Sequence, residues 1–242
     1  MISFVFYLHS SRSENLAQTL RILETRERVE KEVILVCNDK LTCTPKGCRV
    51  LNMELPEYRK ALMCNVGVAE AKGEIVALMD SDRVMSAGYF SSAAREVARG
   101  QFMSCRRILN LSRPHSDEEI ERGDLEFEEE WRAEGCELWR RNLFSGNTVF
   151  HREDYLRSGG MDESFVGYGF ADTDMTMNVI SKGFLPVWSE GPEVHLYHAK
   201  DVSWGGSMHG KETRTKMAES NMCKFLKKWR MKDYLRMCRC MI

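Results

Sequence analysis

The sequence lacks long apolar segments and an excess of charge of one sign. No stretch approaches the roughly 18 consecutive apolar residues that suggest a membrane-spanning helix. The apolar run 2–8 follows no basic segment and is too short for the core of a signal peptide. The formal net charge is only −1, so no overall charge favours nucleic acid. These absences predict a soluble, cytoplasmic protein with no nucleic-acid partner.

A cysteine pattern for a disulfide framework or a zinc site is also missing. The nine cysteines are an odd number and are scattered along the chain. No His or Cys residues accompany the close pairs 43/48 and 238/240 at zinc spacing. Cys37 and Cys105 lie in apolar runs, where a thiol commonly serves as a small core residue. Free thiols in a reducing compartment are therefore expected.

Strand and helix patterns alternate over the first hundred residues, and the length of 242 residues suits one large α/β domain. The expected strands are 2–8, 33–37, 49–53, 74–79 and 101–109, and the expected helices are 14–28, 58–71 and 87–99. Alternation of this kind predicts a parallel sheet whose strands are joined by crossover helices.

Composition divides the chain into four parts, the first being 1–110. Segment 111–141 is strongly acidic and is interpreted as a surface excursion. Segment 142–212 mixes short strands with a helix over 172–182. Segment 213–242 is a basic helical tail. We expect this helix to pack its apolar side on its own domain; weak contact with an anionic membrane surface is the alternative.

Two carboxylates, Asp80 and Asp82, follow the apolar strand expected at 74–79. Ligands of open parallel sheets bind just beyond that end of the strands. Two carboxylates in one turn can share a hard cation, which could clamp a diphosphate and neutralise the charge of a leaving phosphate. An ordinary strand-to-helix turn, in which Asp caps the next helix, would explain the same residues.

A second acidic pair, Asp172 and Asp174, follows the glycine-rich stretch 165–170. A carboxylate there could take the proton of an acceptor hydroxyl during a direct displacement. An acidic residue at a helix N-terminus also stabilises the helix without any catalytic role. Taken alone, this pair favours the structural interpretation.

Two histidines, His195 and His198, lie in an expected strand. Residues three apart in an extended strand face opposite ways, so only one of them should reach a shared site. We expect that residue to be His198, because the glycine-rich loop 203–210 follows it. A neutral imidazole there could complete the ligand set of a metal. Trp204 in this loop is expected to fold over a bound donor.

Residues 61–82, ALMCNVGVAEAKGEIVALMDSD, resemble the signature of family 2 inverting glycosyltransferases of the GT-A fold. In that family an R-N-x-G helix leads through A-x-G-E into a strand that ends in the metal-binding D-x-D. Residues 165–175, FVGYGFADTDM, resemble the F-x-G-[WY]-G-x-E-D-x-D-[LM] motif of galactosyltransferase-type C-terminal halves. GGMDE at 159–163 matches the G-G-[FY]-D-E that precedes it. The likeness covers most of residues 1–198, in the same order and spacing.

The resemblance implies a GT-A (Rossmann-like) α/β fold: a mostly parallel sheet flanked by helices, with a smaller mixed acceptor-side region. It makes 1–110 the nucleotide-sugar-binding half and 142–212 the acceptor and catalytic half. It implies a nucleotide-sugar donor, by family habit a UDP-sugar, a glycan or other hydroxyl acceptor, and Mn²⁺ or Mg²⁺. It also implies a role for individual residues. Asn38 and Asp39 would contact the nucleobase of the donor, and Asn65 would lie in the donor-side helix. Asp80 and Asp82 would bind the diphosphate and the metal, His198 would bind the metal, and Asp172 would be the catalytic base.

Departures from the family pattern keep other functions open. Cys64 stands where the family has Arg, Ala171 where it has Glu, and Asn178 where Arg is common. A degenerate module that only binds glycans or nucleotides is therefore an alternative. Residues 80–84, DSDRV, also fit the D-x-D-x-[TV] motif of phosphatases and phosphotransferases of the haloacid-dehalogenase type, with Asp80 as nucleophile. That motif normally lies on the first strand, whereas here two or three strands precede it.

Overall fold

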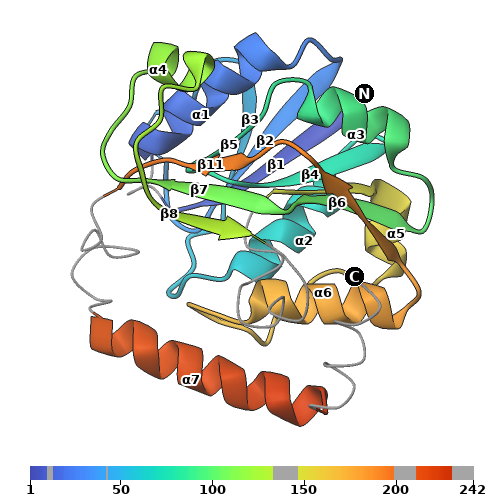
Figure 1. The fold of residues 1–242 in the computed structure, drawn as a ribbon. Coiled ribbons are helices and arrows are strands. Elements are labelled where there is room, and N and C mark those ends of the chain that lie inside the picture. The colour runs from blue at the N-terminus through green and yellow to red at the C-terminus, as the bar shows by residue number, and fades with distance from the viewer. Residues whose placement is uncertain (10–12, 42, 133–146, 199–210, 231–242) are drawn as a thin grey trace.

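The computed structural model describes residues 1–9, 13–41, 43–132, 147–198 and 211–230, which form two sheets with helices around them (Figure 1). The strands are β1 Ile2–Leu8, β2 Lys31–Cys37, β3 Cys48–Asn52, β4 Ile75–Asp80, β5 Arg83–Met85, β6 Gln101–Cys105, β7 Arg107–Leu111, β8 Phe127–Arg132, β9 Thr148–His151, β10 Leu185–Ser189 and β11 Glu193–His195. The helices are α1 Ser13–Arg26, α2 Lys60–Glu70, α3 Tyr89–Glu96, α4 Asp117–Arg122, α5 Arg152–Arg157, α6 Ala171–Ser181 and α7 Lys211–Lys228.

The larger sheet is mostly parallel, as the alternation of strands and helices predicts. Its order is β10-β6-β9-β4-β1-β2-β3. β3, β2, β1 and β4 run parallel to one another, and so do β10 and β6. β9 lies between β4 and β6 and is antiparallel to both. The carboxyl ends of β1, β2 and β4 therefore meet at one edge of the sheet, where ligands of such folds bind.

Apolar side chains on the two faces of this sheet form two cores. One face packs against α2, α5 and α6, and the other against α1 and α3 (Figure 1). α2 crosses β1 so closely that a side chain at Gly67 would collide with Val5. Glycine at this position lets the helix approach the strand, which sets the start of α2 above the edge of the sheet.

The single strand predicted at 101–109 is wrong, because the structure divides it into two strands in different sheets. β6 belongs to the larger sheet, whereas β7 belongs to a second sheet of order β5-β11-β7-β8. The chain changes sheets at Arg106, whose guanidinium lies 5.3 Å from the centre of the Trp188 ring. Local pattern did not reveal this break, because apolar residues continue on both sides of it.

Helix α7 packs on its own domain, as expected for the apolar side of the tail. Its Phe225 is buried against Phe165 and Met177, and Figure 1 shows the helix beside α6. Lys224 donates to the Ser164 carbonyl, and Lys228 donates to Asp162. In the described part of the chain, no helix is both long enough and apolar enough to cross a bilayer. The domain limits and the membrane contact of the tail stay predictions.

Candidate active site

A cleft of about 390 Å³ opens at the edge of the larger sheet where β1 and β4 end. Its walls come from segments far apart in the sequence, because parallel strands bring their carboxyl ends together. The residues that line it are Tyr7, Leu8, His9, Tyr58, Lys60, Asp80, Ser81, Asp82, Arg83, Gly167, Tyr168, Gly169, Phe170, Ala171, Asp172, Thr173, His195, His198, Arg214 and Ala218. The cleft therefore contains the D-x-D turn, the expected base and both histidines.

Asp82, His195 and His198 form a cluster in this cleft. The Nε2 atoms of His195 and His198 lie 3.6 Å and 3.7 Å from the same oxygen, Asp82 Oδ2. One ligand atom from each residue lies within 4.8 Å of the others. The prediction that only one histidine reaches the site is wrong. β11 ends at His195, so the alternation of an extended strand does not continue to residue 198.

Pairing between short strands brings His195 to Asp82. β5 follows the D-x-D turn directly and pairs antiparallel with β11, so that Arg83 lies opposite His195. The Leu196 N–H donates to the Asp82 carbonyl at 2.8 Å and fixes this register beyond the end of β11. The two strands are far apart along the chain, so no local sequence pattern indicates that they pair.

The ring of His195 is oriented by Asn110 on the neighbouring strand β7. β7 runs parallel to β11 and places Asn110 opposite His195, and Asn110 Oδ1 lies 2.8 Å from His195 Nδ1. This contact holds the ring with Nε2 directed toward Asp82 Oδ2. Partners of this kind fix the tautomer and the ring orientation of metal-binding histidines. Two imidazole nitrogens and one carboxylate oxygen fit a divalent transition-metal ion better than Mg²⁺.

Asp80 is not part of this cluster, although the sequence predicts it as a metal ligand. Asp80 Oδ1 lies 3.6 Å from Lys60 Nζ, and Asp80 Oδ2 lies 3.2 Å from Arg83 Nε. The Asp80 N–H donates to Asn147 Oδ1 at 3.0 Å. Both carboxylate oxygens therefore have cationic neighbours within the protein, and Asp82 is the member of the D-x-D that faces the histidines.

The charges around Asp80 alternate in sign across the floor of the cleft. The buried Glu193 carboxylate accepts from the Arg83 guanidinium at 2.9 Å. On the other side, Lys60 Nζ lies 2.7 Å from Asp172 Oδ1. The order of charges is thus Glu193, Arg83, Asp80, Lys60 and Asp172. Because one ammonium contacts both Asp80 and Asp172, the expected base and the D-x-D turn share one small site.

Asp172 lies in the first turn of α6. Burial raises the pKa of its carboxyl group, Lys60 opposes this effect, and the charge of Asp80 adds to it, so that the pKa is above its ordinary value. Burial by itself lowers the pKa of Lys60, but Asp172 and Asp80 raise it above its ordinary value. A carboxylate with a raised pKa beside an open cleft has the properties of a general base.

The second acidic residue of the motif, Asp174, has a structural role. It is 1% exposed and binds Lys228 Nζ at 2.9 Å and Trp229 Nε1 at 2.7 Å. These bonds hold the end of α7 against α6. Asp174 thus fastens the helix that completes the cleft, while Asp172 faces into it.

Asn38 and Asp39, predicted at the nucleotide base, lie where β2 ends. The Asn38 amide donates to the Leu55 carbonyl and accepts from the Arg59 N–H, so its side chain holds the connection between β2 and α2. Asp39 Oδ2 lies 3.5 Å from Nε2 of His9, which lines the cleft. Contact of either residue with a base stays a prediction, and Asp39 is the better placed of the two.

Asn65, predicted on the donor side, joins two of the sequence motifs. Its amide oxygen accepts from Tyr155 and from the Met161 N–H, and its nitrogen donates to Glu163 at 2.9 Å. Gly160, with φ of +68°, leaves the space that this amide occupies. Asn65 therefore fastens α2 to the G-G-M-D-E turn and does not line the cleft. Trp204 lies outside the described residues.

Sequence reasoning missed four groups of this site: His195 as a second facing histidine, Lys60, Arg83 and Glu193. Each of the last three is a charged residue at the end of an apolar element, which is a weak signal of a buried partner. No pattern indicates which carboxylate meets which cation.

Comparisons with known proteins agree with this architecture. A family model described as the N-terminal domain of galactosyltransferase matches residues 126–198. The crystal structure of GalNAc-T7 with UDP, GalNAc and Mn²⁺ superposes with a TM-score of 0.69 and 13% sequence identity, covering 96% of this chain and 48% of that one. An uncharacterised protein of Sinorhizobium fredii, y4gI, is 28% identical in an alignment 174 residues long that covers 65% of this chain and 18% of that protein.

The superposition shows that the chain has the GT-A fold expected from its sequence. This chain spans about half the length of the GalNAc-T7 chain and about a fifth of the y4gI protein. The galactosyltransferase model covers the segment that includes the G-G-M-D-E turn, Asp172 and both histidines. It does not single out family 2, to which the D-x-D signature is similar.

Proposed function

We propose that this chain is a metal-dependent inverting glycosyltransferase that moves a sugar from a UDP-sugar to a hydroxyl of a glycan acceptor. One observation carries the proposal: the cluster of Asp82, His195 and His198 lines the same cleft as Asp172. The fold of a protein crystallised with UDP, GalNAc and Mn²⁺ supports it, as does the match to a galactosyltransferase domain.

The charges of the cleft support a divalent cation. The carboxylates are Asp80, Asp82 and Asp172, with Glu193 behind Arg83, and the cations are Lys60, Arg83 and Arg214. Apart from the histidines, this set carries one more negative than positive charge. Uncompensated charge in a partly buried site is costly, and a nucleoside diphosphate would add further negative charge. A divalent cation at Asp82 and the histidines would offset it.

In the proposed mechanism Asp172 accepts the proton of the acceptor hydroxyl. The hydroxyl oxygen attacks the anomeric carbon from the side opposite the diphosphate, the bond to the diphosphate oxygen breaks, and the configuration inverts. Lys60 holds Asp172 and Asp80 in position on the floor of the cleft. A divalent cation at Asp82, His195 and His198 would supply positive charge toward the leaving diphosphate.

UDP is the proposed nucleotide because Asp39 can accept a hydrogen bond from the N–H of uracil. Asp39 follows β2 and lies beside His9, which lines the cleft. Mn²⁺ is the proposed ion, because two imidazole ligands disfavour Mg²⁺. The transferred sugar, whether a hexose or an N-acetylhexosamine, is to be identified by experiment.

The test is hydrolysis and transfer with a panel of UDP-sugars in the presence of Mn²⁺. We expect the wild-type chain to release UDP from at least one donor, and Asp172→Asn or His198→Ala to lose this activity. The matched control is Asp124→Asn, an exposed carboxylate that pairs with Arg122 at the surface. Removal of Mn²⁺ by a chelator should abolish UDP release, and re-addition should restore it.

The stereochemistry of the product tests the inverting step. Proton NMR of the first product formed should show the anomeric configuration opposite to that of the donor. Retention would refute the role of Asp172 as base. Phosphate release from simple phosphomonoesters, with covalent trapping at Asp80, would instead support a phosphatase of the haloacid-dehalogenase type. Donor binding without turnover would support a binding module.

A further inference from the structure

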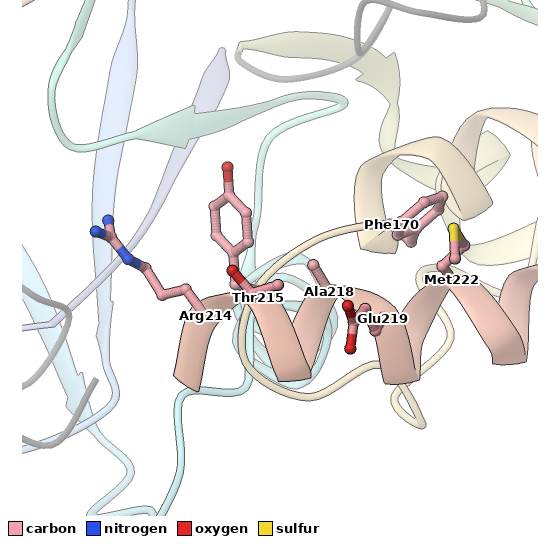
Figure 2. Close-up of a pocket in the computed structure, with 7 residues that line it drawn as sticks. Phe170, Arg214, Thr215, Ala218, Glu219 and Met222 are labelled. Atoms are coloured by element: carbon pink, nitrogen blue, oxygen red, sulfur yellow. The ribbon is translucent and has the colours of Figure 1, made fainter. Parts of the chain in front are cut away.

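A groove of about 320 Å³ lies beside the catalytic cleft, between α7 and the glycine-rich loop that precedes α6. The residues that line it are Tyr168, Phe170, Arg214, Thr215, Ala218, Glu219 and Met222. Those on α7 recur at intervals of about one helical turn, so a single face of the helix forms one wall (Figure 2). Tyr168 and Phe170 form the other wall.

This groove is continuous with the catalytic cleft. Tyr168, Phe170, Arg214 and Ala218 line both. Asp172 follows Phe170 by two residues, at the start of α6. A molecule that presents a hydroxyl to Asp172 can therefore extend into the groove without leaving the protein surface.

The wall opposite α7 is fixed rather than loose. Asn221 is 2% exposed, and its amide donates to the carbonyls of Val166, Tyr168 and Gly169 at 2.9, 3.0 and 3.1 Å. Phe170 has a φ of +66°, which is uncommon for a residue with a side chain. Strain of this kind persists where the surrounding structure holds it, and it occurs often at ligand sites.

The chemistry of the groove matches a sugar ring. Tyr168 is 44% exposed, and Phe170 and Met222 extend the apolar surface. Thr215 and Glu219 add a hydroxyl and a carboxylate along α7. A pyranose likewise has an apolar face of C–H groups and a rim of hydroxyls that hydrogen bond to such side chains.

We propose that this groove binds a second sugar of the acceptor, so that the preferred acceptor is an oligosaccharide of two or more sugars rather than a single sugar. This inference rests on the proposed function of the neighbouring cleft. It assigns α7 to substrate recognition. The residues that recognise the length of the glycan would then be different from those that perform the transfer.

The test measures binding, so it does not depend on turnover. The full chain, with Mn²⁺ and UDP present, is applied to immobilised mono-, di- and trisaccharides, and the best pair is titrated in solution. We expect at least one disaccharide to bind about tenfold more tightly than its terminal monosaccharide. This is the gain in affinity expected from one additional contact between a sugar ring and an aromatic side chain. Met222→Trp, which fills the groove, should remove this ratio. Leu226→Trp, on an exposed part of α7 outside the groove, should preserve it.

Three results would overturn the proposal. The first is equal affinity for single sugars and longer glycans, or no glycan binding at all. The second is a length preference that Met222→Trp leaves unchanged. The third is a stronger gain from an alkyl or aryl aglycone than from a second sugar, which would assign the groove to a lipid-like group. Failure of the proposed function is a separate result, because it appears as absence of Mn²⁺-dependent hydrolysis of UDP-sugars.

Discussion

Replacement of Lys60 by methionine tests how much the positive charge of this side chain contributes to the stability of the protein. The ammonium group lies 2.7 Å from Asp172 and 3.6 Å from Asp80. The Lys60 side chain is 11% exposed, and the carboxylate side chains are 26% and 20% exposed. Methionine keeps the length and apolar character of the stem while it removes the charge. Two carboxylates would then share a poorly hydrated site without the cation between them.

The expected loss of stability follows from this geometry. Removal of one partner of a buried ion pair costs about 3–5 kcal/mol. Asp80 keeps Arg83 as a neighbour, and both carboxylates keep some contact with solvent, so the lower end of this range applies. We therefore expect Lys60→Met to lower the free energy of unfolding by about 3 kcal/mol at pH 7.5.

The pH dependence gives this prediction a definite sign. Burial already raises the pKa of Asp172, and loss of the opposing Lys60 charge should raise it further. A carboxyl group with a higher pKa in the folded than in the unfolded protein destabilises the fold at high pH, and this cost falls as the pH drops. The difference between the variant and the wild type should therefore narrow between pH 8 and pH 5.

Urea unfolding in the presence of a chelator measures both effects. Lys227→Met is the matched control: Lys227 is an exposed lysine near the end of α7, and its replacement should change stability by less than about 0.5 kcal/mol. A loss below about 1 kcal/mol at pH 7.5 for Lys60→Met, or the same loss at every pH, would refute the assignment of Lys60 as the cation that separates the two carboxylates.

Two further predictions concern residues outside the chemistry itself. Asn110→Ala removes the group that orients His195 and should lower Mn²⁺ affinity about 10–100-fold by calorimetric titration; unchanged affinity would mean that His195 is not a ligand. Asn221→Leu leaves three carbonyls of the glycine-rich loop without their donor and should destabilise the protein by about 1–3 kcal/mol in thermal unfolding, whereas an unaltered melting temperature would show that the loop does not depend on α7.

Part of the fold was readable from local signals. The apolar strand before Asp80 was predicted at 74–79 and spans Ile75–Asp80. The helix predicted at 58–71 spans Lys60–Glu70. Apolar periodicity and glycine positions act over a few residues, so they indicate elements and their ends. They also place Asp172 at the start of a helix, and the order of parallel strands places the D-x-D turn at the ligand-binding edge.

Other features were invisible to local signals. The run 101–109 gave no sign that it divides between two sheets. Strand alternation predicted a single facing histidine, whereas β11 ends at His195 and both rings reach Asp82. No local pattern indicated a partner for Lys60, although it lies between two carboxylates.

The sequence alone thus determined the class of fold, the residue types that the site needs, and the turn and the helix in which Asp82 and Asp172 lie. The tertiary structure decided which groups meet: β5 with β11, His195 with Asn110, and Lys60 with Asp172. The physical reason is that periodicity and turn chemistry depend on neighbours along the chain. Ligand sets and ion pairs depend instead on strand register and helix packing between segments about a hundred residues apart.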